Sequence, residues 1–171
     1  MEKLLAGVFN NQGKKGITVL KFGGKSLSNG SGLESVLQII SDKVAVGENI
    51  AVVLSAREKA TDILESLLAK AAKGLSYHDA FEAFKSYQAH ACKKVDLTPE
   101  FRSLAKLFEG VALLGDYSAK VKDEVLAYGE LLSGKLVVAL LQERGIKAQL
   151  LDSRKLIVTC LLYTSPSPRD S

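Results

Sequence analysis

An unbroken apolar run that ends in two glycines is the feature that most restricts what this chain can fold into. Residues 17–22, ITVLKF, are typical of a buried strand, and Gly23 and Gly24 mark a tight turn directly after it. Apolar residues then recur at helical spacing over residues 33–44, before a second apolar run at residues 50–54. The order strand, turn, helix, strand indicates a βαβ unit. Continuous apolar strands favour a parallel sheet that is covered on both faces.

After the second strand the pattern stays helical for a long way, and a third strand follows at residues 148–151. The expected helices cover residues 61–74, 77–94, a segment starting at Thr98-Pro99, residues 118–128 and residues 130–144. The fold class is therefore α/β, with a helical excursion between the second and third strands.

The two ends of the chain are expected to lie outside this domain. Residues 1–15 read as a short N-terminal leader. Residues 160–171 show neither helical nor strand periodicity, and CLLYTSPSPRD is similar to the translation of a sequencing adapter. We interpret this tail as non-native; a natural disordered tail rich in Ser and Pro is the alternative. On the first interpretation, the native protein continues past Thr159.

Composition excludes several classes of function. Hydrophobic residues make up 47% and charged residues 25%, as in folded soluble domains. The net charge of +4 is not gathered into runs of like charge, so no nucleic-acid partner is expected. Cys92 and Cys160 show no spacing for a metal or a disulfide framework, which fits a reducing cytoplasm. The apolar piece near the N-terminus is too short to cross a membrane, so no membrane partner is expected either.

The glycine turn is the candidate for chemistry. Two adjacent glycines let the backbone approach a ligand closely, and backbone N–H groups at such a turn suit a phosphate. Lys21 and Lys25 would add positive charge for a transferring phosphoryl group. The alternative is an ordinary turn between a strand and a helix, with solvated lysines. The segment is neither a Walker A loop nor a GxGxxG loop.

Four segments together resemble the aspartate kinases. Residues 19–26, VLKFGGKS, resemble the opening K-F-G-G-T-S of that family. The other three follow in the family's order: VVLSA with ATD at residues 52–62 (family V-V-S-A…T-N), GELLS at residues 129–133 (family G-E-x-x-S) and LDSR at residues 151–154 (family L-D-A-R). Each segment is weak by itself, but their order over residues 17–155 is specific. The chain looks most similar to the kinase half of the bifunctional aspartokinase–homoserine dehydrogenases.

The resemblance implies a fold and a division into segments. The fold would be a three-layer αβα sandwich with a mainly parallel sheet, as in amino-acid and carbamate kinases, and it would be incomplete. Residues 16–159 would be the N-terminal part of the catalytic domain. Ligands would bind at the carboxyl ends of the strands.

The resemblance also implies roles for single residues. Lys21, Gly23, Gly24, Ser26 and Ser55 would hold the phosphates of ATP, and Lys21 would be catalytic by stabilising charge in phosphoryl transfer.

Thr61 and Glu130 would bind L-aspartate, Glu130 through the α-ammonium group. A carboxylate at a helix N-terminus is held ionised by the helix dipole and can pair with an ammonium group. The alternatives are a helix-capping acid at Glu130 and an N-cap hydroxyl at Thr61. Ser133 is expected to pack or cap rather than react.

Two positions depart from the family pattern. Lys25 stands where the family usually has Thr, and Asp62 stands where Asn is common. His78, His90 and Cys92 in the helical excursion are interpreted as packing or surface residues.

The reaction implied is transfer of the ATP γ-phosphoryl group to the β-carboxylate of L-aspartate, with Mg²⁺ bridging the phosphates. The complete protein is expected to be a homo-oligomer, and these 171 residues alone are expected to be inactive because further family segments would follow Thr159. Three other hypotheses stay open: an amino-acid kinase with another acceptor, a non-catalytic phosphate-binding module and, on charge alone, an RNA-binding module.

Overall fold

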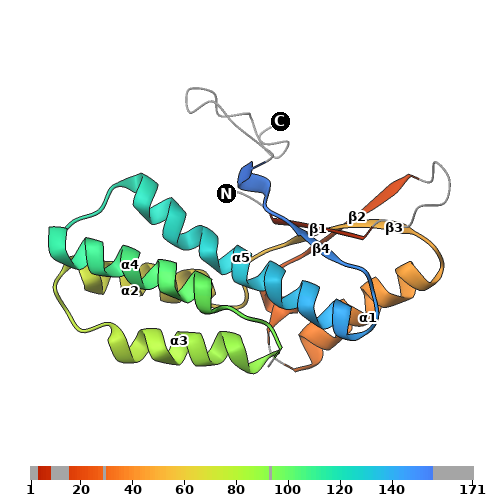
Figure 1. Ribbon diagram of the computed structural model, residues 1–171, viewed down its shortest axis with the longest axis horizontal. Helices are drawn as coiled ribbons and strands as arrows, with labels where there is room; N and C mark the ends of the chain where they lie inside the picture. Colours follow the sequence, from red (N-terminus) through yellow and green to blue (C-terminus); the bar gives the residue numbers. More distant parts are fainter. Residues whose placement is uncertain (1–3, 9–15, 29, 93, 156–171) are drawn as a thin grey trace.

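The computed structural model describes residues 4–8, 16–28, 30–92 and 94–155. A small sheet lies above helices α1 (Ser31–Ala45) and α5 (Ala119–Glu143) in Figure 1. A group of three helices extends to one side of it: α2 (Ala60–Ala72), α3 (His78–His90) and α4 (Thr98–Leu114). The expected tail at residues 160–171 is outside the described residues. None of the described helices is both long and apolar enough to span a membrane.

The sheet is built on the predicted βαβ unit. Strands β2 (Ile17–Phe22) and β3 (Asn49–Leu54) pair in parallel, with Ile17 opposite Asn49 and Phe22 opposite Leu54. Helix α1 connects them, as the periodicity predicted, and packs against the sheet. The third predicted strand is present as β4 (Gln149–Leu151).

Strand β1 (Leu4–Val8) was not predicted. It lies between β3 and β4 and pairs antiparallel with both, so the strand order is β2-β3-β1-β4. The segment interpreted as a leader therefore contributes a strand to the sheet. The sheet is mixed rather than parallel throughout, although β2, β3 and β4 all run in the same direction. The α/β class is confirmed.

One face of the sheet packs against helices. Side chains alternate along a strand, so Leu20, Val52 and Leu54 share the face that packs on α1 and α5. On the opposite face of β2, Ile17 is 57% and Val19 is 63% exposed. Among the described residues this face has no helical layer, so the expected three-layer sandwich stays a prediction.

Helix α5 connects two hydrophobic cores. Its C-terminal half supplies Leu136, Val137 and Leu141 to the core beneath the sheet. Val125 in its N-terminal half and Leu132 at its middle belong to a second core among α2, α3 and α4. A 25-residue helix is about 37 Å long, enough to reach from one core to the other.

Residues 118–128 and 130–144 were predicted to be two helices separated at Gly129, and this was wrong. Gly129 lies inside the continuous helix α5, where it is buried. Its lack of a side chain allows close packing and does not break the helix, as its contacts described below show.

The aromatic side chains Tyr77, Phe81 and Phe108 meet in the second core, with the ring centroids of Phe81 and Phe108 5.3 Å apart.

Candidate functional site at the carboxyl ends of β2 and β3

The two glycines after β2 play different parts. A β-carbon on Gly24 would lie 2.5 Å from the carbonyl oxygen of Ala56, so the turn fits against the end of β3 only without a side chain there. Apart from its chain neighbours, the only described atom that a β-carbon on Gly23 would meet is the ammonium nitrogen of Lys21, at 3.8 Å. Gly24 is therefore a packing glycine, whereas Gly23 leaves its backbone open toward the space beside Lys21.

Lys21, Gly23 and Ser55 gather at one place. The N–H of Ser55 donates to the carbonyl of Phe22 at 3.1 Å, which continues the parallel ladder one residue past β3. By strand alternation, these three residues lie on the sheet face opposite α1 and α5. Lys21 is exposed and Ser55 is half-buried. An exposed ammonium group beside an open backbone turn and a hydroxyl is a suitable arrangement for an anion.

Ser26 lies in η1 (Gly24–Leu27), the short 3-10 turn that follows. Its N–H donates to the carbonyl of Gly23 at 3.1 Å, and its side chain is exposed. The structure therefore places Ser26 in the same turn as the glycines.

Helix α5 reaches the same region through Gly129. A β-carbon on Gly129 would lie 2.9 Å from the β-carbon of Ala56 and 3.8 Å from that of Ala60. This close approach places the neighbouring Glu130, which is half-buried, next to the segment that contains Thr61. Gly24 and Gly129 thus contact Ala56 from two sides, and three distant segments of the chain converge there.

Two details of the predicted acceptor residues were wrong. Glu130 lies in the middle of α5 rather than at a helix N-terminus, so it neither caps the helix nor gains from its dipole. Thr61 is the second residue of α2 and exposed; the N-cap position is held by Lys59, whose φ of 61° is left-handed. The hydroxyl of Thr61 is therefore not the N-cap of α2.

Sequence reasoning missed the buried residue that ties this region together. Arg57 follows Ala56 and is 1% exposed. Its Nε donates to the carbonyl of Leu27 at 3.1 Å, and its Nη1 donates to Oε1 of Gln88 at 3.1 Å and to the carbonyl of Tyr87 at 3.3 Å. The guanidinium carbon lies 4.4 Å from the centroid of the Tyr87 ring, a cation–π contact. Burial lowers the pKa of Arg57 from its usual range, and the Tyr87 hydroxyl partly opposes this.

Ser133 holds the backbone of the same residue. Its hydroxyl accepts from the N–H of Arg57 at 3.0 Å and donates to the carbonyl of Gly129 at 2.9 Å. Ser133 is fully buried, so the expectation of a packing role is confirmed. No pattern in the sequence marks Arg57, because a charged residue after a strand is usually solvated.

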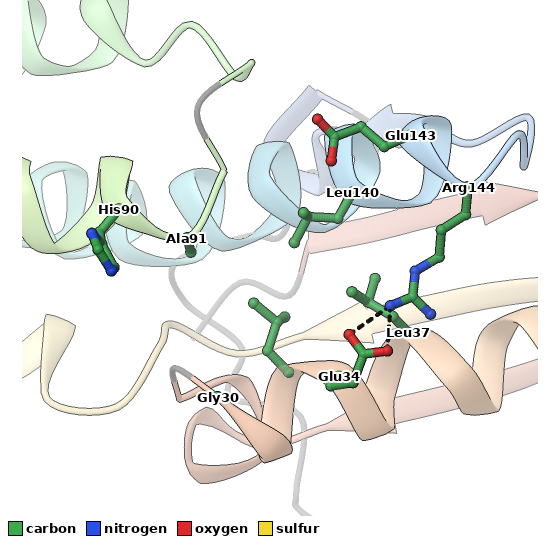
Figure 2. A pocket seen from close by; sticks show the side chains of 9 residues that line it. Gly30, Glu34, Leu37, His90, Ala91, Leu140, Glu143 and Arg144 are labelled. Atoms are coloured by element: carbon green, nitrogen blue, oxygen red, sulfur yellow. Dashed lines mark hydrogen bonds and ion pairs between the residues drawn. The ribbon is translucent and has the colours of Figure 1, made fainter.

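Two cavities lined by described residues lie beside this region. One cavity, of about 420 Å³, lies between α1, the end of α3 and the end of α5. Figure 2 shows the side chains that line it, among them the ion pair of Arg144 and Glu34, whose closest atoms are 2.6 Å apart. A second cavity, of about 340 Å³, lies between α2 and α3 and is lined by Lys59 and Asp62. Neither is lined by Lys21 or Glu130.

The remaining histidines and the described cysteine agree with the packing or surface interpretation. His78 and His90 are exposed, and Cys92 is buried in the core beneath the sheet. Within the described ranges, no group of three or more His, Cys, Asp or Glu side chains is placed to hold a metal ion.

The chain is similar to known proteins over most of its length. The model of the amino acid kinase family matches residues 16–169. The chain is 27% identical over 150 residues to "Aspartokinase 1, chloroplastic" of Arabidopsis thaliana, an alignment that covers 82% of the chain and 26% of that protein. It is 30% identical over 152 residues to "Lysine-sensitive aspartokinase 3" of Escherichia coli strain K12, covering 84% of the chain and 32% of that protein.

A third relative is the "Bifunctional aspartokinase/homoserine dehydrogenase" of Buchnera aphidicola subsp. Acyrthosiphon pisum, 26% identical over 154 residues, or 82% of the chain and 19% of that protein. The chain spans a third or less of the length of each of these relatives.

Proposed function

Because this chain belongs to the amino acid kinase family, we propose that it carries the ATP phosphate site and part of the acceptor site of an aspartate kinase. The reaction is transfer of the γ-phosphoryl group of ATP to the β-carboxylate of L-aspartate. The observation that carries the proposal is the convergence on Ala56, where Gly24 and Gly129 approach its atoms from two sides. This contact joins the segment of Lys21 to that of Glu130, two segments that resemble aspartate kinases.

The phosphate half of the site consists of Lys21, Gly23, Gly24, Ser26 and Ser55. In the proposed mechanism the open backbone at Gly23 and the hydroxyl of Ser55 bind phosphate oxygens of ATP. The Lys21 ammonium group, 3.8 Å from the position of a β-carbon on Gly23, stabilises the negative charge of the transferring group. The space at Gly23 suits a phosphate, because apart from its chain neighbours no other atom of the described residues lies within 4 Å of that position.

The acceptor half of the site consists of Thr61 and Glu130. The carboxylate of Glu130 pairs with the α-ammonium group of aspartate, and the Thr61 hydroxyl hydrogen-bonds the same substrate. The protein supplies position and charge, with no covalent intermediate.

Mg²⁺ is expected to enter with ATP. In the proposal the phosphates of ATP supply its main ligands. No step of the proposed mechanism is assigned to the ion.

We propose that the activity needs more chain than these residues, since the alignments cover only 26% and 32% of the two aspartokinases. The exposed apolar side chains Ile17 and Val19 on the sheet face of Lys21 support this, because such a face is usually covered in a complete α/β domain. Assembly into a homo-oligomer stays a prediction.

The test is ADP release with a panel of acceptors: L-aspartate, L-glutamate, N-acetylglutamate, carbamate and a nucleoside monophosphate. Residues 1–171 and any longer product of the same gene are measured in parallel. We expect the longer product to turn over ATP fastest with L-aspartate, and residues 1–171 to bind ATP without turnover. A faster rate with another acceptor would transfer the assignment to that acceptor. ATP binding with no turnover by the longer product would favour the non-catalytic phosphate-binding module.

A further inference from the structure

Arg57 links two parts of the fold that do not follow one another in the chain. On one side, its Nε donates to the carbonyl of Leu27, the last residue of the turn after the two glycines. On the other side, its Nη1 donates to Gln88 and to the carbonyl of Tyr87 near the end of α3. One side chain thus holds the turn and α3 at a fixed distance.

The linkage is rigid for three reasons. Arg57 is 1% exposed, so its hydrogen bonds do not compete with bulk water. Its planar guanidinium group is stacked over the Tyr87 ring, which fixes its rotation. Its own backbone is held at the N–H by the buried hydroxyl of Ser133.

The turn is also attached to the fold by packing, since the side chain of Leu27 is fully buried in the core beneath the sheet and Gly24 lies against Ala56. Its internal hydrogen bonds are local ones, from the Ser26 N–H to Gly23 and from the Ser28 N–H to Lys25. Local bonds of this kind do not fix a turn relative to the rest of the fold. The bond from Arg57 to the carbonyl of Leu27 adds a link of another kind, because the same buried side chain also bonds to α3.

We propose that Arg57 is a positioning residue that sets the orientation of the phosphate-binding turn, and that Gln88 of α3 acts on this turn through it. The proposal rests on the proposed phosphate site at Gly23 and Lys21. It makes α3, which supplies none of the predicted site residues, a determinant of ATP affinity.

Gln88 offers the sharpest way to test this, because it is attached to the turn only through Arg57 in the proposal. Its Oε1 accepts from Arg57, while its Nε2 is buried with no hydrogen-bond partner among the described residues. The change Gln88→Met keeps the length of the side chain and removes the acceptor. The change Gln88→Glu keeps the acceptor and gives it a charge that a buried guanidinium group binds more strongly. Ser86→Ala, at an exposed position of the same helix, is the control.

The experiment measures amide hydrogen exchange at Ser26 and Ser28 in residues 1–171, together with ATP affinity by titration calorimetry. In Gln88→Met we expect exchange at both amides to be about tenfold faster, the change that corresponds to the loss of one hydrogen bond. ATP affinity should fall by a similar factor. Gln88→Glu should restore both values to those of the wild type or better, and Ser86→Ala should change neither.

Unchanged exchange at Ser26 and Ser28 in Gln88→Met, with altered exchange around residue 88, would overturn the inference. Failure of the wild-type chain to bind ATP would instead count against the proposed phosphate site, and the exchange measurement would still decide whether Arg57 couples α3 to the turn. A melting temperature recorded for each variant distinguishes global destabilisation, since that would accelerate exchange throughout the chain.

Discussion

The carbonyl oxygen of Ala56 lies 2.5 Å from the position that a β-carbon on Gly24 would occupy. Real β-carbons do not approach an oxygen so closely, so the end of β3 and the turn after β2 fit together only around a glycine. The adjacent Gly23 has an ordinary extended backbone, with φ −80° and ψ 166°, and space for a side chain. We therefore expect substitution of the two glycines to have different effects, one on stability and the other on ATP binding.

Gly24→Ala is expected to destabilise the fold by about 1–3 kcal/mol, the usual cost of forcing an extra carbon into a packed site. Gly23→Ala should leave the free energy of unfolding within about 0.5 kcal/mol of wild type but weaken ATP binding, because the added methyl group occupies the space assigned to a phosphate. Urea unfolding and ATP titration of both variants check this. Equal ATP affinity for Gly23→Ala and the wild type would place the phosphates elsewhere.

The tight packing of Gly129 leads us to expect opposite stability effects in a second pair of variants. Inside a helix, Gly→Ala normally stabilises by about 0.5–1 kcal/mol. At Gly129 the new β-carbon would lie 2.9 Å from that of Ala56, whereas at Gly110 in α4 it would meet no described atom within 4 Å outside its chain neighbours and its own helix backbone. We expect Gly129→Ala to destabilise and Gly110→Ala to stabilise, with opposite signs in the same urea assay. Stabilisation by Gly129→Ala would show that α5 is not in tight contact with Ala56.

The sequence predicted most of the elements because their signals are local. Apolar periodicity marked α1, β2, β3 and β4, and each is present. Strand β1 was not predicted from the sequence, because a five-residue run carries little periodicity and its pairing with β3 and β4 depends on residues far along the chain. The continuity of α5 escaped for a related reason: Gly129 looks like a helix break until its contact with Ala56 is known.

The sequence indicated which segments form the candidate site, but not how their residues are arranged in space. Motifs indicated Lys21, Ser55 and Glu130, but not that Glu130 lies mid-helix. Arg57 could not be found from the sequence, because its burial is decided by elements about 30 residues away on either side, at Leu27 and Gln88.

We expect loss of the Ser133 hydroxyl to lower the free energy of unfolding, because that hydroxyl pairs a buried backbone N–H. Its hydroxyl accepts from the N–H of Arg57, so Ser133→Ala leaves that buried donor unpaired. We expect a loss of about 1–3 kcal/mol in the free energy of unfolding. Ser35→Ala is the matched control, since the Ser35 hydroxyl donates to the carbonyl of Ser31 in the same way but is exposed; its effect should stay within about 0.5 kcal/mol. Equal effects of the two variants would contradict the role of Ser133.

We expect the protonation of Asp96 to make the free energy of unfolding depend on pH in the acidic range. Its carboxylate accepts from the backbone N–H of Thr98 at 2.9 Å, and this bond holds the pKa of Asp96 below its usual value of 3.8. A depressed folded-state pKa contributes stability that is present above the unfolded-state pKa and is lost as the pH falls through the folded-state value. Asp96→Asn keeps an acceptor but does not titrate. The stability difference between wild type and this variant should therefore be constant from about pH 5 to 7 and shift against the wild type at lower pH. A difference that is independent of pH throughout would refute the linkage.

We expect replacement of Lys21 to weaken ATP binding without lowering the free energy of unfolding. Its side chain is exposed, so Lys21→Met should leave the free energy of unfolding within about 0.5 kcal/mol of wild type. If its ammonium group binds a phosphate, the variant loses a charge-assisted hydrogen bond, and ATP affinity should fall about 10- to 100-fold. Lys25→Met removes an exposed lysine four residues away, at the position where aspartate kinases usually have Thr, and should weaken binding less. Titration of both variants with ATP at two salt concentrations separates a specific contact from general attraction, since salt screens the latter more strongly. A similar, salt-sensitive decrease in both variants would mean that Lys21 acts only through the net charge of the surface.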